Sequence, residues 1–565
     1  MGFQSIGTIE GTLLAIAMPH SADHPGWGTS SSALVTLPRY PVLAAIDIGT
    51  NSIHMAVVRV DPDLPSFEII AREKSTVRLG DRDPDTGNLT PEAIQRSIAA
   101  LSRCYDLAAS LKVDRTVAVA TSATRESPNG RDFLRQVRKE VGLHVDLIAG
   151  PEEARRIYLG VLSGLEFEGK PHAVIDIGGG STELILGDGH EPRYLSSTKV
   201  GAVRLTAAFI EHDPPTKTEF TALQGYARGM LERAVEELQE RLHPHETIKD
   251  VTLVGTSGTI ECLAEFHARS TLGIVPSPLQ GYTLTLDAIR DIVDYLRTLT
   301  VPKRRELPGM NERRAEIIVA GAVVLQEAME LLGLDRLVVC ERALREGIVV
   351  DWMLGQGLIE DRLRFQSSVR QRSTLALAHK YQVNLAAAEH VAKLALMFFD
   401  QTQGLLHGWE EEERELLWAA AILHSCGLHI GHSAHHKHAY YLIRYGELYG
   451  FTETEVEVIA NLARYHRKSA PKKRHENYQN LTGKSRRKLV EELSPLLRLA
   501  VALNRRQIQA VEKIQCQILG DRKQFRLLLS PANPEDPCAL EQWSVNLEKV
   551  VFEDQFEMPL ELVVE

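Results

Sequence analysis

Two short segments of the sequence combine an aspartate with glycines and hydroxyl side chains. The first is Asp47-Ile48-Gly49-Thr50-Asn51-Ser52, and the second is Asp176-Ile177-Gly178-Gly179-Gly180-Ser181-Thr182-Glu183. Glycines let a backbone approach a ligand closely, and successive amide groups in such turns form a concave anion-binding surface. Carboxylates beside these amides are the hard oxygen ligands that Mg²⁺ prefers. The pattern is typical of a site that binds phosphate together with a metal ion.

A third loop of the same character occurs at Gly255-Thr256-Ser257-Gly258-Thr259. One such turn would be explained by an ordinary hairpin, but three in one chain favour phosphate binding. The predicted phosphate-binding residues are Gly49, Thr50, Asn51, Ser52, Gly178, Gly179, Gly180, Ser181, Thr182, Gly255, Thr256, Ser257, Gly258 and Thr259. The predicted metal ligands are Asp47, Asp176 and Glu183.

The segments around the first two loops predict how they are positioned. Apolar runs at 42–46 and 53–60 flank the first loop, and 173–175 and 184–186 flank the second, so each loop is predicted to be the turn of a β-hairpin. A motif that recurs at about the size of one domain suggests a duplicated α/β unit. Two lobes would then face each other across a cleft that contains both loops.

These loops closely resemble those of the exopolyphosphatase and guanosine pentaphosphate phosphohydrolase (Ppx/GppA) family. The resemblance extends over about residues 41–510 and includes the motifs at 121–126, 150–155, 201–205, 314–318 and 344–347. It implies an α/β fold of the actin and hexokinase-like superfamily, with two actin/ribonuclease H-like lobes around a cleft. It also implies hydrolysis of phosphoanhydride bonds.

The resemblance assigns the catalytic residues. In the family, the second glutamate of a Glu-Glu-Ala-Arg stretch is the catalytic base, which corresponds to Glu153 here. Arg314 is the candidate for offsetting charge on the phosphoryl oxygens, together with Mg²⁺, for which Mn²⁺ can substitute. Without the family, Glu152 and Glu153 would be interpreted as acids that stabilise a helix N-terminus after Pro151.

His54 follows the first loop, where some family members have arginine. Its ring would either touch phosphate or pack against neighbouring residues, and the sequence leaves both interpretations open.

Helical periodicity dominates beyond about residue 357. In this region His424 and Ser425 stand where a metal-dependent HD phosphohydrolase has a His-Asp pair, with His390 upstream and Asn504 near the expected downstream aspartate. Serine and a carboxamide bind divalent cations more weakly than carboxylates do. The sequence therefore predicts an HD-like fold without its metal chemistry, and the nearby histidines lack the partners of a zinc site.

The predicted domains follow from these patterns. They are a poorly ordered extension at 1–40, a first actin-like lobe at 41–165, a second at 166–357, a helical HD-like domain at 358–515 and a small α+β terminal domain with a sheet at 516–565.

A run of basic residues lies in the helical domain. Residues 464–474 contain no acid, although the whole chain has a net charge of −11. Such a run is either a solvated helix face or a local anion-binding surface. The candidate polyphosphate track consists of Arg467, Lys468, Lys472, Lys473 and Arg474.

Bulk properties exclude several classes of protein. No apolar run reaches the roughly 20 residues that a membrane helix needs, and the net charge argues against general nucleic-acid binding. The six cysteines form no C-x-x-C pair, which favours a reducing cytoplasm over a disulfide framework. We expect a cytoplasmic homodimer.

The sequence favours an exopolyphosphatase that releases terminal orthophosphate from inorganic polyphosphate. The basic run suits a long anion, and no aromatic site for guanine is evident. The alternative is a guanosine pentaphosphate 5′-phosphohydrolase that makes guanosine tetraphosphate, and a further alternative is a non-catalytic phosphate or alarmone sensor. The superfamily also contains ATP-dependent kinases and chaperone-like ATPases. Glu153 beside the second loop disfavours a kinase.

Overall fold

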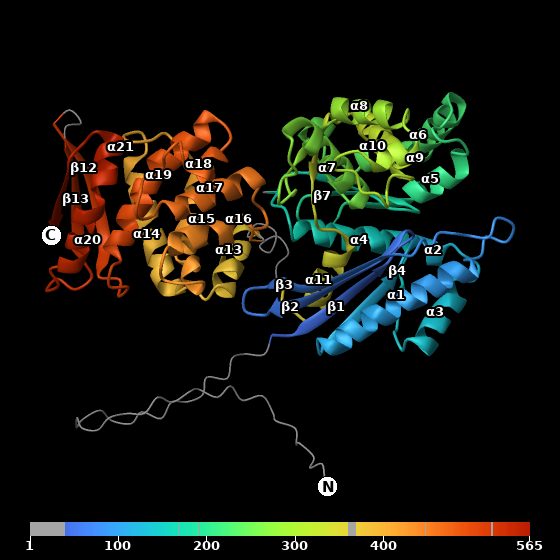
Figure 1. The fold of residues 1–565 in the computed structure, drawn as a ribbon, viewed down its shortest axis with the longest axis horizontal. Helices are drawn as coiled ribbons and strands as arrows, with labels where there is room; N and C mark the ends of the chain where they lie inside the picture. Colours follow the sequence, from blue (N-terminus) through green and yellow to red (C-terminus); the bar gives the residue numbers. More distant parts are fainter. Residues whose placement is uncertain are drawn as a thin grey trace, which may run out of the picture. The chain divides into compact units, whose positions relative to one another are not determined.

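The computed structural model describes residues 40–167, 169–190, 192–359, 369–446, 448–520 and 524–564 (Figure 1). The predicted extension at 1–40 lies outside the described residues, apart from Tyr40. The described chain forms three β-sheets connected and covered by helices, so the predicted α/β class is confirmed. None of the described helices is long and apolar enough to cross a membrane.

The first sheet has the strand order β3-β2-β1-β4-β5. Its strands are β1 (Val42–Ile48), β2 (Ser52–Asp61), β3 (Ser66–Thr76), β4 (Arg115–Ala120) and β5 (Asp146–Leu147), and its helices are α1 (Pro91–Ser110), α2 (Ser122–Arg125) and α3 (Gly130–Glu140). Alternate residues of β1 belong to two different core clusters, with Leu43 in one and Ala44 in the other. Both faces of the sheet are therefore covered, which explains the continuous apolar run.

The second sheet has the order β10-β11-β9-β6-β7-β8. Its strands are β6 (His172–Ile177), β7 (Thr182–Gly187), β8 (Tyr194–Thr198), β9 (Thr252–Thr256), β10 (Thr283–Thr285) and β11 (Arg336–Val339). Its helices are α5 (Ala202–Phe209), α6 (Lys217–Gln239), α7 (Gly258–Leu272), α8 (Leu286–Leu296), α9 (Val301–Arg305) and α10 (Ile318–Leu332). The β6–β7 hairpin with β9 parallel to β6 repeats the β1–β2 hairpin with β4 parallel to β1. This repeat is what a duplicated α/β unit predicts.

Two helices pack against each other close to both sheets. They are α4 (Gly150–Leu162) and α11 (Leu344–Gly355). A Cβ atom at Gly160 would lie 2.0 Å from the carbonyl oxygen of Ala343, so only glycine permits this approach. The contact brings the first turns of α4 and α11, with Glu153 and Arg345, to the same cavity.

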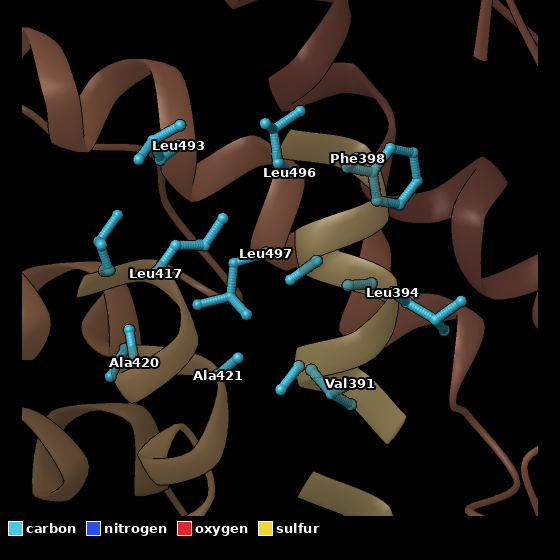
Figure 2. Close-up of a cluster of buried hydrophobic side chains, with 14 of the residues drawn as sticks. Val391, Leu394, Phe398, Leu417, Ala420, Ala421, Leu493, Leu496 and Leu497 are labelled. Atoms are coloured by element: carbon cyan, nitrogen blue, oxygen red, sulfur yellow. The ribbon is translucent and has the colours of Figure 1, made fainter. Parts of the chain in front are cut away.

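The chain from residue 369 onward is helical up to residue 503, as predicted. Its helices are α13 (Val369–Lys380), α14 (Leu385–Thr402), α15 (Glu411–Leu423), α16 (His435–Arg444), α17 (Glu453–Arg464), α18 (Glu476–Gln479) and α19 (Lys484–Leu503). Figure 2 shows how Phe398 of α14, Leu417 of α15 and Leu497 of α19 meet in its core, where all three are fully buried.

A small sheet of order β12-β13-β14 ends the chain. Its strands are β12 (Val511–Leu519), β13 (Gln524–Pro531) and β14 (Leu560–Val564), with α20 (Ala539–Glu548) and α21 (Val550–Phe556). The predicted terminal sheet is therefore present. Phe525 and Phe552 belong to the same hydrophobic core as the helices, so the sheet packs on the helical region rather than around a core of its own.

Candidate active site

The turns of the two repeated hairpins meet at one cavity. It has a volume of about 290 Å³, and its lining combines residues of both sheets with the N-terminal ends of α4, α7 and α11. A Cβ atom at Gly180 would lie 2.5 Å from Ser122 Oγ and 2.7 Å from Thr50 Oγ1. The absence of a side chain at Gly180 is thus what allows the second loop to approach the first.

The two turns have the same local geometry. The Gly49 N–H donates to the Ser52 carbonyl oxygen at 3.1 Å, and the Gly178 N–H donates to the Ser181 carbonyl oxygen at 2.9 Å. Each turn follows a buried strand whose last two residues are an aspartate and an isoleucine. The same short sequence pattern therefore folds in the same way in both hairpins, because these hydrogen bonds span only a few residues.

Most of the predicted phosphate-binding residues line the cavity. They are Gly49, Thr50, Asn51, Ser52, Gly178, Gly179, Gly180, Ser181, Ser257, Gly258 and Thr259. Thr182, Gly255 and Thr256 do not. The Thr182 hydroxyl donates to Val200 O, Thr256 Oγ1 donates to Arg342 O, and a Cβ at Gly255 would meet Leu337 in the core. These three residues are therefore committed to contacts within the protein and do not reach the cavity.

The third loop is hydrogen-bonded to the second sheet, and the side chain of Arg314 lies against this loop. The hydroxyls of Ser257 and Thr259 both donate to the Ile177 carbonyl oxygen at 3.0 Å. A Cβ at Gly258 would lie 2.0 Å from Arg314 Nη2, so glycine makes room for the guanidinium. Arg314 Nη1 donates to Thr259 Oγ1 at 3.3 Å, which orients this cation at the cavity.

The two glutamates at the start of α4 have different surroundings. Glu153 is buried at the cavity and accepts a hydrogen bond from Arg125 Nη1 at 3.0 Å. Burial raises the pKa of Glu153, while Arg125 opposes the shift. Glu152 instead pairs with Arg155 and Arg156, which lower its pKa. Of these two glutamates, only Glu153 lines the cavity.

Three further carboxyl groups of the cavity, those of Asp47, Asp176 and Glu183, are buried, and their negative charges repel one another and that of Glu153. Burial, with the charge of Glu153, raises the pKa of Asp47 to about 7 and that of Asp176 to about 8, and raises the pKa of Glu183 well above its usual range. Within the part of the chain that the structure describes, Asp47 Oδ1 is buried without a hydrogen-bond partner. These oxygens fit a hard cation, which would relieve the repulsion.

In the described residues no group of three or more His, Cys, Asp or Glu side chains is placed to hold a metal ion by itself. Asp47, Asp176 and Glu183 would therefore have to share a cation with oxygens of the substrate or with water. Sharing of this kind is ordinary for Mg²⁺, which keeps several waters and bridges phosphates.

Several residues at or next to the cavity were not predicted. Arg345 lines the cavity, and Arg125 is hydrogen-bonded to Glu153. Both arginines lie in motifs that carry the family resemblance, but neither motif indicated a contact with Glu153 or His54. Lys74 on β3 also lines the cavity, and no local pattern signals it. Burial and the positive charges of Arg314 and Arg345 lower the pKa of Lys74, which shows that cations gather at this part of the cavity.

A second cavity, of about 420 Å³, lies in the helical region and is lined by His424, Ser425, His435, His466 and Asn504 among others. His424, Ser425 and Asn504 were expected at a degenerate HD site, whereas His390, also expected there, does not line this cavity. The ring Nδ1 atoms of His424 and His466 lie 2.6 Å from the carbonyl oxygens of Ala421 and Ala463. The histidines are thus held by the protein backbone, and the HD-like character of the domain stays a prediction.

The basic loop between α17 and α18 lies away from the first cavity. Lys468, Lys472, Lys473 and Arg474 are exposed, and Arg467 lines the second cavity. Two more distant arginines are structural: Arg498 pairs with Glu548, and Arg506 pairs with Asp536 and Glu541. The four exposed side chains of this loop are accessible to an anion.

Comparison with known families decides the assignment. The profile of the Ppx/GppA phosphatase family matches residues 56–356, and that of Ppx/GppA phosphatase domain III matches residues 369–549. The chain belongs to the Ppx/GppA phosphatase family. It is therefore a hydrolase of phosphoanhydride bonds, a reaction that generally uses a divalent metal ion.

Two relatives are similar along most of their length. The guanosine-5′-triphosphate,3′-diphosphate pyrophosphatase of Vibrio vulnificus is 30% identical over 85% of this chain and 91% of its own. The protein of that name from Vibrio parahaemolyticus is 29% identical over 89% of this chain and 95% of its own. A solved exopolyphosphatase from Cytophaga hutchinsonii is 27% identical and covers 56% of this chain and 98% of its own, with a TM-score of 0.50.

Proposed function

We propose that this protein removes the terminal phosphate from the 5′-triphosphate of guanosine pentaphosphate, leaving guanosine tetraphosphate. The observation that carries the proposal is the extent of similarity to the two Vibrio relatives, which spans 85% and 89% of this chain and so includes the helical region. The likeness to the exopolyphosphatase covers 56%. The relatives thus support the nucleotide more strongly than polyphosphate, the reverse of the preference from sequence alone.

Glu153 is the proposed catalytic base. A water molecule beside its carboxylate gives up a proton to Glu153 as the water oxygen attacks the terminal phosphorus. The bond from that phosphorus to the bridging oxygen breaks, and the bridging oxygen leaves with the rest of the substrate. The raised pKa of Glu153 makes the carboxylate a stronger base, and the hydrogen bond from Arg125 holds it in place.

The loops and cations of the cavity are proposed to hold the phosphate. The backbone amides of the Gly49 and Gly178–Gly180 turns, with the Ser52 hydroxyl, donate to its oxygens. Arg314 offsets negative charge that develops on them. Asp47, Asp176 and Glu183 would hold a Mg²⁺ ion, for which Mn²⁺ can substitute, and the chemistry of that ion is to neutralise phosphate charge.

Inorganic polyphosphate is the second candidate substrate. Two observations favour it: the described lining of the cavity contains no Phe, Tyr or Trp to stack on guanine, and the basic loop of Lys472, Lys473 and Arg474 is exposed. Both substrates end in the same phosphoanhydride, so the same residues would act on either.

Phosphate release from each substrate tests the proposal. Purified full-length protein with Mg²⁺ is given guanosine pentaphosphate, short polyphosphate or long polyphosphate, and the products are separated by anion exchange. We expect kcat/KM for guanosine pentaphosphate to exceed that for either polyphosphate by about 10-fold. A higher kcat/KM for polyphosphate would favour the second candidate, and binding of both without phosphate release would favour a sensor.

A further inference from the structure

Ser52 and His54 form a contact that the proposed chemistry has not used. Both residues lie in the first three positions of β2 and line the cavity. Ser52 Oγ lies 2.7 Å from His54 Nε2. Ser52 is buried, and within the described part of the chain its hydroxyl has no other hydrogen-bond partner. The role of this hydroxyl therefore depends on which of the two atoms carries the shared proton.

The other nitrogen of His54 decides this question. Arg345 Nη1 lies 3.4 Å from His54 Nδ1 with hydrogen-bond geometry, and a guanidinium can only donate. The guanidinium is fixed in turn, because its Nε and Nη2 donate to Glu346 Oε1 at 2.9 and 2.8 Å. Glu346 also accepts from the Ala343 N–H at 3.1 Å. His54 Nδ1 is therefore held as an acceptor.

A neutral imidazole carries one proton, and with Nδ1 accepting, that proton resides on Nε2. His54 then donates to Ser52 Oγ. The opposite direction would leave both ring nitrogens without a proton, which a histidine does not sustain in water. A doubly protonated ring would place its Nδ1–H against the N–H of Arg345. Burial, with the charges of Lys74, Arg345 and Arg314, also lowers the pKa of His54 to about 3.

We infer that His54 is a positioning residue that makes the Ser52 hydroxyl a hydrogen-bond donor to the bound phosphate. Because Ser52 Oγ accepts from His54, its own proton is left to point into the cavity. Phosphate oxygens only accept, so a hydroxyl with this orientation needs no reorganisation when substrate arrives. The relay runs from Arg345 through His54 to Ser52, and it rests on the proposed function because it needs phosphate in this cavity.

A double-mutant cycle on the full-length protein tests the relay. We expect Ser52→Ala and His54→Ala each to lower kcat/KM for guanosine pentaphosphate by about 10-fold. The double variant is expected to lose no more than Ser52→Ala alone, because His54 acts through the hydroxyl. If the double variant loses the product of the two single losses, His54 acts independently of Ser52 and the inference is wrong.

Two conservative variants sharpen the test. The amide of His54→Gln reaches the place of Nε2 and can donate to Ser52, whereas that of His54→Asn reaches only the place of Nδ1. We expect His54→Gln to recover most of the activity and His54→Asn to behave like His54→Ala. Equal activity of the two variants would contradict the relay.

Direct observation of the ring complements the kinetics. In protein labelled with ¹⁵N-histidine, NMR is expected to show His54 as the neutral Nε2–H tautomer, and the Nδ1–H tautomer would overturn the inference. Wild-type protein that releases no phosphate from any substrate would instead refute the proposed function, and the tautomer would still report on the contact.

Discussion

Two cavities of this protein, one at the hairpin turns and one in the helical region, bury titratable groups whose pKa values shift in opposite directions. In the first, of about 290 Å³, burial raises the pKa of Asp47 and Asp176, and Asp47 Oδ1 has no hydrogen-bond partner among the described residues. In the second, of about 420 Å³, burial lowers the pKa of His424 to about 4, and the ring is bonded to a backbone carbonyl. The first cavity thus gathers carboxyl groups from several elements, whereas the second gathers histidine rings that hydrogen-bond to backbone carbonyls.

This difference shows how a cavity that can do chemistry is distinguished from one that stabilises a fold. Both contain histidine or carboxyl groups at spacings that suggest catalysis. Only the first surrounds them with glycine turns whose amides can receive an anion, as at Gly49 and Gly178. Backbone amides that can receive an anion, rather than the residue types alone, indicate where a phosphate belongs.

The largest loss of activity is expected when Glu153 in the first cavity is replaced. Glu153→Gln keeps the shape of the side chain but cannot accept the proton, so kcat is expected to fall by about 10²-fold or more while substrate still binds. Phosphate release and equilibrium binding measure the two effects. Glu152→Gln is the matched control and should retain kcat within about 2-fold, since Glu152 faces Arg155 and Arg156. Near-normal turnover in Glu153→Gln would remove it from this role.

Loss of a carboxylate should change the metal requirement. Asp176→Asn and Glu183→Gln are each expected to raise the Mg²⁺ concentration for half-maximal activity by about 10-fold, because a hard ion loses a charged ligand. The measurement is a metal titration of phosphate release after chelation. Asp291→Asn, an exposed acid on α8, is the control and should leave the titration unchanged. Full wild-type activity in excess chelator would contradict the assignment.

The basic loop gives a smaller effect that depends on substrate length. Charge reversal at Lys472, Lys473 and Arg474 is expected to raise KM for long polyphosphate, by about 10-fold at low salt, where charges are least screened. The kcat on guanosine pentaphosphate is expected to stay unchanged. Reversal of the exposed Arg131, Arg135 and Lys139 on α3 is the control of equal charge. Equal losses in both triple variants, or on both substrates, would argue against a track.

The smallest effect on turnover is expected in the second cavity. His424→Ala removes a buried ring that is bonded to the Ala421 carbonyl, so the free energy of unfolding should fall by about 1–3 kcal/mol. Catalysis should change by less than about 2-fold. Denaturant unfolding and phosphate release are measured on the same preparation. A loss of kcat beyond about 10-fold without loss of stability would show that the second cavity takes part in the reaction.

The sequence predicted the fold and the first two loops well for a physical reason. The N–H groups of Gly49 and Gly178 donate to the carbonyl oxygens of Ser52 and Ser181, three residues further along the chain. The conformation of each turn therefore depends on a few neighbouring residues. The helical region and the terminal sheet likewise follow from periodicity. The third loop was predicted less well, because Gly255 and Thr256 are still part of β9 and face the packed interior.

The sequence by itself determined which segments form the hairpins, the helical region and the acidic glycine turns, because each depends on residues within a few positions of one another. Only the tertiary structure decided which side chains act together. Arg125 is hydrogen-bonded to Glu153 of α4. Arg345 contacts His54, 291 positions away in the chain, because α11 packs against α4 and the first sheet. Contacts at such separations are set by the packing of whole elements, which no local pattern of residues records.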